Sequence, residues 1–146
     1  MPRHFTLAQA EQMLPEVEQA LRDALFHKSE YQAGEEELTR NIQRIRMAGG
    51  SRVNQGPILA ARARRDTSAA ALKEIFERVE AMGVLIKDLD IGLIDFLTRY
   101  HGQDVYLCWK LGEDRIRFWH GMEEGFRGRK PIDDEFLQNH RGDAVV

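Results

Sequence analysis

Two different spacings of apolar residues divide the chain. In the first half the apolar positions recur at alternating intervals of four and three, which is the spacing of one face of an α-helix. A glycine-containing loop at residues 49–57 interrupts this pattern, which then continues to Val79. We therefore predict two long antiparallel helices whose seams face each other. The predicted seam positions are Val17, Leu21, Ala24, Lys28, Tyr31, Glu35, Leu38, Ile42 and Ile45 in the first helix and Ile58, Arg62, Arg65, Ala69, Leu72, Phe76 and Val79 in the second.

The ends of these helices carry their own signals. Thr6 can cap a helix that begins at about Leu7, and Gln9 can bond back to the backbone of Thr6. Pro15 should kink or restart this helix, because proline lacks the N–H group that the helical ladder needs. Gly83, after which β-branched residues replace the helical spacing, ends the second helix.

Charged residues interrupt both seams. Antiparallel pairing brings Glu35 within about one helical turn of Arg65, so the two side chains could form an ion pair that fixes the register of the helices. The alternative is that both side chains extend into solvent.

After Gly83 apolar and polar residues alternate, as they do in strands. His101-Gly102 suits a two-residue type I′ turn, which pairs Arg99 with Asp104 and Phe96 with Leu107. A second turn at Leu111–Asp114 would pair Lys110 with Arg115 and place His120 on the core face. In this register one face of the ribbon is apolar throughout, and we expect the helices to cover it. It consists of Ile94, Phe96, Val105, Leu107, Trp109, Ile116 and Phe118.

The predicted fold class is therefore α+β, with a long antiparallel helical hairpin packed on a small antiparallel meander of about four strands. The 146 residues suit a single domain, with the hairpin in residues 1–82 and the meander and C-terminal tail in residues 83–146. We expect Phe126 to anchor a loop laid over the sheet, and the chain to be frayed from about Gln138.

Charge is distributed unevenly along the chain. The net charge is -3, yet the segment from Arg40 to Arg65 holds seven arginines and no acidic residue. The first functional hypothesis is a non-enzymatic interaction module whose hairpin tip, with Arg62, Arg64 and Arg65, binds an acidic protein or nucleic acid. Against nucleic acid, the segment has no aromatic residue to stack on a base, and the rest of the chain is acidic. Alternatively, these arginines are solvated or pair with acids of a second subunit.

The second helix is rich in small residues, which favour close packing against another helix. We therefore expect a homodimer formed through the hairpins. The small residues are Ala60, Ala61, Ala63, Ala69, Ala70 and Ala71.

The second candidate site is the polar face of the predicted sheet, which we expect to be exposed. The register sets Asp95 beside Cys108 and Cys108 beside Arg117, and a closing turn at residues 90–93 would add Asp88 next to Asp95. Two carboxylates and a thiol could bind a divalent cation, and a guanidinium could hold an anion. Such a site could also be hydrolytic. The alternative is a cross-strand ladder in which Arg117 neutralises the acids and Cys108 is a small apolar spacer. Glu113 and Arg129 should lie nearby.

Motifs of known chemistry are missing from the sequence. It contains no His-Glu-x-x-His run, no zinc-type cysteine pair, no glycine-rich phosphate loop and no Ser/His/Asp order, so we expect no cofactor and assign no catalytic residue. No apolar run approaches the roughly 18 residues that a membrane span needs. The N-terminus lacks the apolar core of a signal peptide, and a lone Cys108 cannot form an internal disulfide. We therefore expect a cytoplasmic protein with no membrane partner.

Several motifs resemble the bacterial family known as domain of unknown function 2203. They are FTLAQAEQMLP near the N-terminus, KDLDIGLIDF (Lys87 to Phe96), VYLCWKLGE (Val105 to Glu113), FWH (Phe118 to His120) and GFRGR (Gly125 to Arg129). Leu97 departs from the family pattern, in which a proline is expected after Asp-Phe. The resemblance covers nearly the whole chain and implies a bacterial cytoplasmic protein, but no activity, substrate or cofactor.

Overall fold

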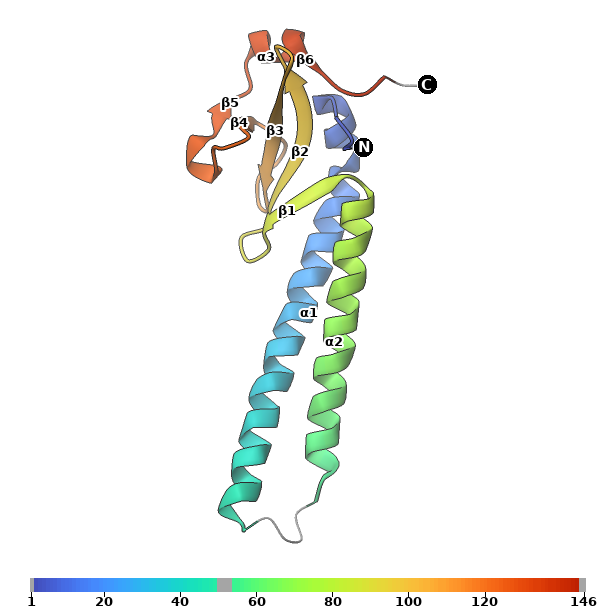
Figure 1. The fold of residues 1–146 in the computed structure, drawn as a ribbon, viewed down its shortest axis with the longest axis vertical. Coiled ribbons are helices and arrows are strands. Elements are labelled where there is room, and N and C mark those ends of the chain that lie inside the picture. The colour runs from blue at the N-terminus through green and yellow to red at the C-terminus, as the bar shows by residue number, and fades with distance from the viewer. Residues whose placement is uncertain (1, 50–53, 145–146) are drawn as a thin grey trace. The chain divides into compact units, whose positions relative to one another are not determined.

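The computed structural model describes residues 2–49 and 54–144, in which the two long helices precede all the strands in sequence (Figure 1). Contacts divide the chain into two compact units. One, here called the sheet unit, comprises the residues up to Leu21 and from Glu77 onward; the other, the hairpin unit, comprises Arg22–Phe76. Arg52, one of the seven arginines of the predicted tip, lies outside the described residues.

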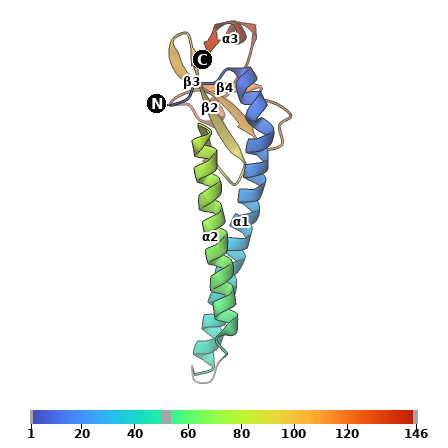
Figure 2. The ribbon, with the colours of Figure 1, turned by 90° about the vertical axis from the view of Figure 1, so that its right-hand side faces the viewer.

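The hairpin unit is built from parts of two helices, α1 (Leu7–Met47) and α2 (Gly56–Ala81), which run side by side in opposite directions (Figure 2). Leu38, Ile58 and Ala61 form its buried apolar cluster. Gly34 lies against the backbone of α2: a Cβ atom at this position would be 3.0 Å from the amide nitrogen of Arg65. The absent side chain therefore allows the two helices to approach closely.

The predicted seam of α2 is wrong by one residue at alternate positions. Ala61, Ser68 and Ile75 are buried, whereas the prediction placed Arg62, Ala69 and Phe76 there. Both sets follow a spacing of three and four, so periodicity alone cannot separate them. The observed set leaves the guanidinium of Arg62 in solvent, which avoids the cost of burying a charge.

The start of α1 agrees with the sequence. The Thr6 hydroxyl accepts a hydrogen bond from the Gln9 N–H (3.1 Å), and the Gln9 side chain accepts one from the Thr6 N–H (2.9 Å), which together form a capping box. α1 continues through Pro15, so the helix does not restart there, and the predicted kink stays a prediction. Leu14 and Val17 on either side of it are buried, and their packing offsets the lost backbone hydrogen bond.

One antiparallel sheet forms the centre of the sheet unit, which confirms the α+β class with more strands than predicted. Its strands follow the order β1-β2-β3-β4-β5, and β6 pairs with β2. The short elements η1 (Phe126–Gly128) and α3 (Asp134–Asn139) lie between the last strands. The strands are β1 (Val84–Asp88), β2 (Leu93–Tyr100), β3 (Gln103–Lys110), β4 (Phe118–Gly121), β5 (Lys130–Pro131) and β6 (His140–Arg141).

The β2–β3 hairpin has the predicted register, with Arg99 opposite Asp104 and Phe96 opposite Leu107. Its two turn residues, His101 and Gly102, have φ angles of 51° and 78°. Two successive positive φ angles are typical of a type I′ turn, whose twist matches that of the flanking strands.

The predicted register between β3 and β4 is wrong by one residue. Cys108 pairs with Phe118 and Tyr106 pairs with His120, so Phe118 and Trp109 lie on opposite faces of the sheet. A slip of one residue moves every side chain of a strand to the other face. The predicted continuous apolar face therefore loses Phe118, and His120 leaves the core face.

Residues between the two strands explain this slip. The carboxylate of Glu113 accepts a hydrogen bond from the Lys110 N–H, so this N–H does not pair with a neighbouring strand. The Ile116 N–H bonds to the side chain of Glu11 in α1 (3.0 Å), and the Arg117 carbonyl accepts the N–H of Ile132. These long-range bonds hold the connection open, so β4 begins at Phe118 rather than directly after a tight turn.

The core of the sheet unit lies on the face that carries Phe96, Leu107 and Trp109. Phe5 packs edge-to-face on Phe96, with ring centroids 5.3 Å apart. Phe136 of α3 is fully buried, and β6 pairs with β2, so the expectation of a frayed chain from Gln138 is wrong for the residues described. The described helices include none that is both apolar enough and long enough to cross a bilayer. The predicted homodimer stays a prediction.

Candidate functional site

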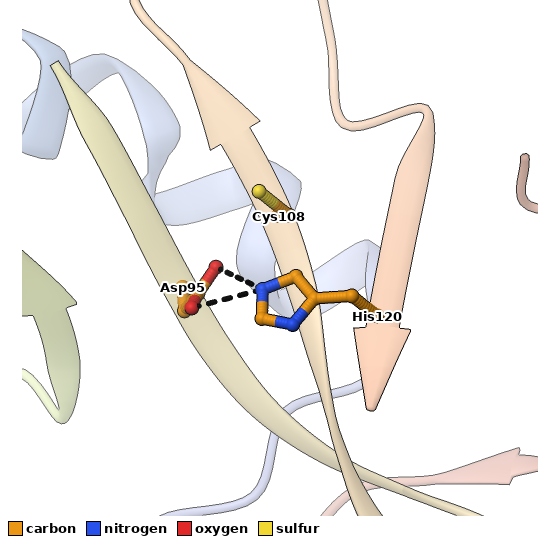
Figure 3. Close-up of side chains that lie close together, drawn as sticks. All are labelled: Asp95, Cys108 and His120. Atoms are coloured by element: carbon orange, nitrogen blue, oxygen red, sulfur yellow. Dashed lines mark hydrogen bonds and ion pairs between the residues drawn. The ribbon is translucent and has the colours of Figure 1, made fainter. Parts of the chain in front are cut away.

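The opposite face of the sheet holds three potential metal ligands on neighbouring strands. Asp95 comes from β2, Cys108 from β3 and His120 from β4 (Figure 3). Their ligand atoms all lie within 4.8 Å of one another, and the three residues are 1%, 0% and 4% exposed, so the prediction that Asp95 and Cys108 lie on an exposed face is wrong. This group, here called the buried triad, is the only cluster of its kind among the described residues.

Two strand registers assemble the triad. The type I′ turn after β2 sets Asp95 directly opposite Cys108. The open connection before β4 then places His120 opposite Tyr106, two residues along β3 from Cys108 and therefore on the same face. Because β3 lies between β2 and β4, the His120 ring reaches across β3, beside Cys108, to meet the carboxylate of Asp95.

The imidazole of His120 has oxygen acceptors at both nitrogens. Nε2 lies 3.0 Å from each carboxylate oxygen of Asp95, and Nδ1 lies 2.9 Å from the Gly121 carbonyl oxygen. Burial alone would lower the pKa of His120, but the hydrogen bonds to Asp95 and Gly121 and the charge of Asp95 outweigh it. The net result is a pKa above the usual value for histidine, with both ring nitrogens donating.

The thiol of Cys108 is held in its neutral form. Burial is the main cause that raises its pKa to about 12, and the nearby charge of Asp95 adds to the effect. A nucleophilic cysteine needs a lowered pKa and access to substrate. Cys108 has neither, and both nitrogens of His120 are bonded elsewhere, so the triad is not a cysteine–histidine catalytic pair.

The structure separates two of the predicted site residues from the triad. Arg117 pairs with Asp114 through two hydrogen bonds of 2.9 and 2.8 Å, which lower the pKa of Asp114 to about 2. Asp88 lies opposite Leu93, and a bulge after Ile86 sets Leu85, not Asp88, beside Asp95. Asp88 instead accepts the N–H of Asp90. The predicted neighbours of Asp95 and Cys108 are therefore wrong on both sides, although the Asp95–Cys108 pair is confirmed.

Glu113 and Arg129 form an ion pair close to the triad. Arg129 Nη2 lies 2.6 Å from Glu113 Oε2, and both charges influence the Cys108 thiol. The guanidinium of Arg129 lies 4.0 Å from the ring centroid of Phe118 and 4.8 Å from that of Phe126. Phe126 itself is 42% exposed, so it holds Arg129 in place instead of serving as a buried anchor.

His120 is the site residue that sequence reasoning missed. Alternation within β4 correctly predicts that Trp119 faces the other side of the sheet from Phe118 and His120. Which side His120 occupies depends on the register of β4 against β3. The place of His120 at the end of a strand, near Glu123 and Glu124, suggested a ligand or a base, but the predicted register set it on the core face.

The arginines of the predicted tip have two different environments. In the hairpin unit Arg65 bonds Glu35 (3.1 Å), which confirms the predicted ion pair, and also bonds Asp66 (3.1 Å). Arg64 bonds Glu30 (2.8 Å) and lies 3.4 Å from Glu37. Arg62 is exposed, and no ion pair of Arg62 is found within residues 2–49 and 54–144.

Comparison with known families adds one result. The model of a family described as "uncharacterized conserved protein (DUF2203)" matches residues 3–132. The chain belongs to the DUF2203 family. The predicted resemblance is thus confirmed, and the match includes the whole triad as well as Glu113 and Arg129. No curated protein and no solved structure shows significant similarity to this DUF2203 member.

Proposed function

We propose that the sheet unit binds a divalent transition-metal ion, Zn²⁺ being the best fit, through Asp95, Cys108 and His120. The observation that carries this proposal is the convergence of three buried ligand atoms of different types from three strands. Thiolate, imidazole and carboxylate are the side chains that zinc sites use.

The distances require only a small contraction. Bond lengths of about 2.0–2.1 Å to nitrogen or oxygen and 2.3 Å to sulfur place tetrahedral ligand atoms roughly 3.3–3.6 Å apart. The separation of 3.0 Å between His120 Nε2 and Asp95 is already close to this value. The widest separation in the triad, at most 4.8 Å, would have to close by about 1 Å, which a small side-chain rotation supplies.

The charge of the site favours exchange of two protons for one metal ion. Without metal, both ring nitrogens of His120 face oxygen acceptors, Nδ1 the Gly121 carbonyl and Nε2 the Asp95 carboxylate, so each nitrogen needs a proton to make its hydrogen bond, and Cys108 is a neutral thiol. A divalent ion that replaces the Nε2 proton and the Sγ proton leaves the net charge of the site unchanged. Because a buried site tolerates little net charge, this balance makes the exchange favourable.

The second nitrogen of His120 is already oriented for a metal ligand. Nδ1 donates to the Gly121 carbonyl, which fixes the ring and directs Nε2 toward Asp95 and Cys108. Such a bond to a backbone carbonyl is the usual support of a histidine that binds metal.

Binding without catalysis is the function that fits this burial. Three protein ligands leave one position of a tetrahedral ion for a ligand such as water, as in catalytic zinc sites. Here, however, all three residues are at most 4% exposed, which keeps a substrate away from the ion. The metal would therefore stabilise the sheet unit.

Titration of chelator-treated protein with Co²⁺, followed by Zn²⁺, tests the proposal. The expected result is the near-ultraviolet charge-transfer absorption of a thiolate–cobalt bond, lost when Zn²⁺ displaces Co²⁺. Calorimetry in buffers of different ionisation enthalpy should show release of about two protons per ion. Absence of the absorption band, or binding without proton release, would overturn the proposal.

Two variants make the test specific. Cys108→Ala keeps the Asp95–His120 pair and should abolish the cobalt band. His101→Gln is the matched control, because His101 is an exposed histidine that lies 3.4 Å from Glu135 and does not touch the triad. An unchanged band in Cys108→Ala would also contradict the proposal.

A further inference from the structure

The loop end of the hairpin unit carries charge that the unit does not neutralise. Residues 40–49 and 54–65 contain six arginines, no lysine and no acidic residue. Arg64 and Arg65 are bonded to acids of the same unit. The four others are exposed, and among the described residues none of them has an ion pair. They are Arg40, Arg44, Arg46 and Arg62.

We propose that Arg40, Arg44, Arg46 and Arg62, here called the free arginines, bind the phosphate backbone of a nucleic acid. The proposal is independent of the metal site, because all four residues belong to the hairpin unit.

Two of the free arginines are arranged to suit a row of phosphates. Arg40 and Arg44 are four residues apart in α1, which sets them on one helix face with an axial separation of about 6 Å. They line a shallow groove with Gln43, Met47 and Ala48. A guanidinium can donate two parallel hydrogen bonds to one phosphate, so each arginine can hold a separate phosphate group.

The start of α2 adds to the positive potential at this end. Its first turn contains no acidic residue, and the unpaired N–H groups of a helix N-terminus carry partial positive charge. Arg62 follows within α2, at about two turns from Gly56. The dipole of α2 therefore acts in the same direction as the free arginines.

A nucleic acid fits this surface better than an acidic protein does. Protein interfaces need an apolar centre, usually with aromatic residues. The described part of this end has no aromatic side chain, and its exposed large apolar residues are Met47 and Leu59. The lack of aromatic residues also means that bases are not stacked, so binding should depend on phosphates and be independent of sequence.

Fluorescence anisotropy of the full-length protein with a labelled 20-base-pair DNA duplex, at several salt concentrations, tests the proposal. With four phosphate contacts, the plot of log K against log salt should have a slope of about -3.6. In a variant with all four free arginines changed to Gln, binding should fall at least tenfold at low salt and the slope should approach zero. No binding at low salt, or unchanged binding in this variant, would overturn the proposal.

A control with the same change in net charge separates the surface from general electrostatics. This control variant replaces four exposed cationic residues that do not belong to the free arginines and that have no ion pair in the described structure. It should bind the duplex as tightly as the unchanged protein does. Equal loss of binding in both variants would overturn the proposal. The control substitutions are Lys73→Gln, Arg78→Gln, Arg115→Gln and Arg127→Gln.

A second probe distinguishes the class of partner. Labelled poly-glutamate of the same charge should bind more weakly than the duplex and with a smaller slope, because carboxylates of a flexible chain must be ordered on binding. If poly-glutamate binds as tightly as the duplex, the surface is one for acidic proteins and the nucleic-acid proposal is wrong.

Discussion

His120 Nε2 lies 3.0 Å from both carboxylate oxygens of Asp95, although 25 residues separate the two in sequence. Both side chains are buried, and Cys108 lies between them in the sheet order. This contact joins β2 to β4 across β3. It is the centre of the candidate metal site, and it couples the charge of His120 to the fold of the sheet unit.

The first prediction concerns the pH dependence of stability. The pKa of His120 is raised in the folded protein, so protonation stabilises the fold. The stabilisation is complete below the unfolded pKa of about 6.5 and is lost as the pH rises through the higher folded value. In urea unfolding with a chelator present, His120→Gln should cost about 3–5 kcal/mol at low pH, because the Asp95 charge is left unpaired.

The difference between the two proteins should shrink as the pH rises. His101→Gln serves as the control, since this exposed side chain should not alter the profile. A difference that is constant across pH would show that His120 does not titrate with folding.

The second prediction concerns the reactivity of Cys108. A pKa of about 12 leaves the folded protein with roughly 10³-fold less thiolate at pH 8 than an ordinary cysteine has. Labelling with a disulfide reagent should therefore be slower by at least this factor in the folded protein and reach the ordinary rate in urea. Rapid labelling of the folded protein would show that the thiol is accessible and activated.

The third prediction concerns the start of α1. Thr6→Ala removes the acceptor for the Gln9 N–H and should lower the free energy of unfolding by about 1 kcal/mol. Thr39→Ala is the matched control: this exposed threonine lies inside α1 and bonds only the Glu35 carbonyl, so its loss should change stability by less than about 0.5 kcal/mol. Equal effects in urea unfolding would contradict a capping role for Thr6.

The fourth prediction concerns the close approach of the helices at Gly34. A Cβ atom there would lie 3.0 Å from the Arg65 amide nitrogen and 3.2 Å from the Ala61 carbonyl oxygen. Gly34→Val should destabilise the hairpin unit by about 1–3 kcal/mol through overpacking, even though valine is the better helix former. Gln32→Val, at an exposed position of the same helix, should cost only a few tenths of a kcal/mol. A neutral Gly34→Val would show that the helices can separate there without cost.

Local signals were sufficient for much of this fold. The type I′ turn at His101-Gly102, the capping box at Thr6 and the Glu35–Arg65 ion pair each involve residues close in sequence or related by simple antiparallel pairing. Periodicity identified both helices, but it could not tell whether Ala61 or Arg62 faces the partner helix, because both positions satisfy the same spacing.

The sequence also shows that the arginines are clustered, but it does not show which of them form ion pairs and which do not. The pairing of Arg65 with Glu35 followed from the antiparallel register, whereas the pairing of Arg64 with Glu30 and Glu37 is given only by the structure. The free arginines are defined by this tertiary pairing.

The sequence by itself determined the α+β class, the two long helices, a meander of about four strands and the Asp95–Cys108 pair, because these follow from periodicity and from one tight turn. Only the tertiary structure decided that His120 joins that pair. The bonds from Glu11 to Ile116 and between Arg117 and Ile132 hold the chain before β4 one residue out of the predicted register. In a strand, one residue is enough to exchange the two faces.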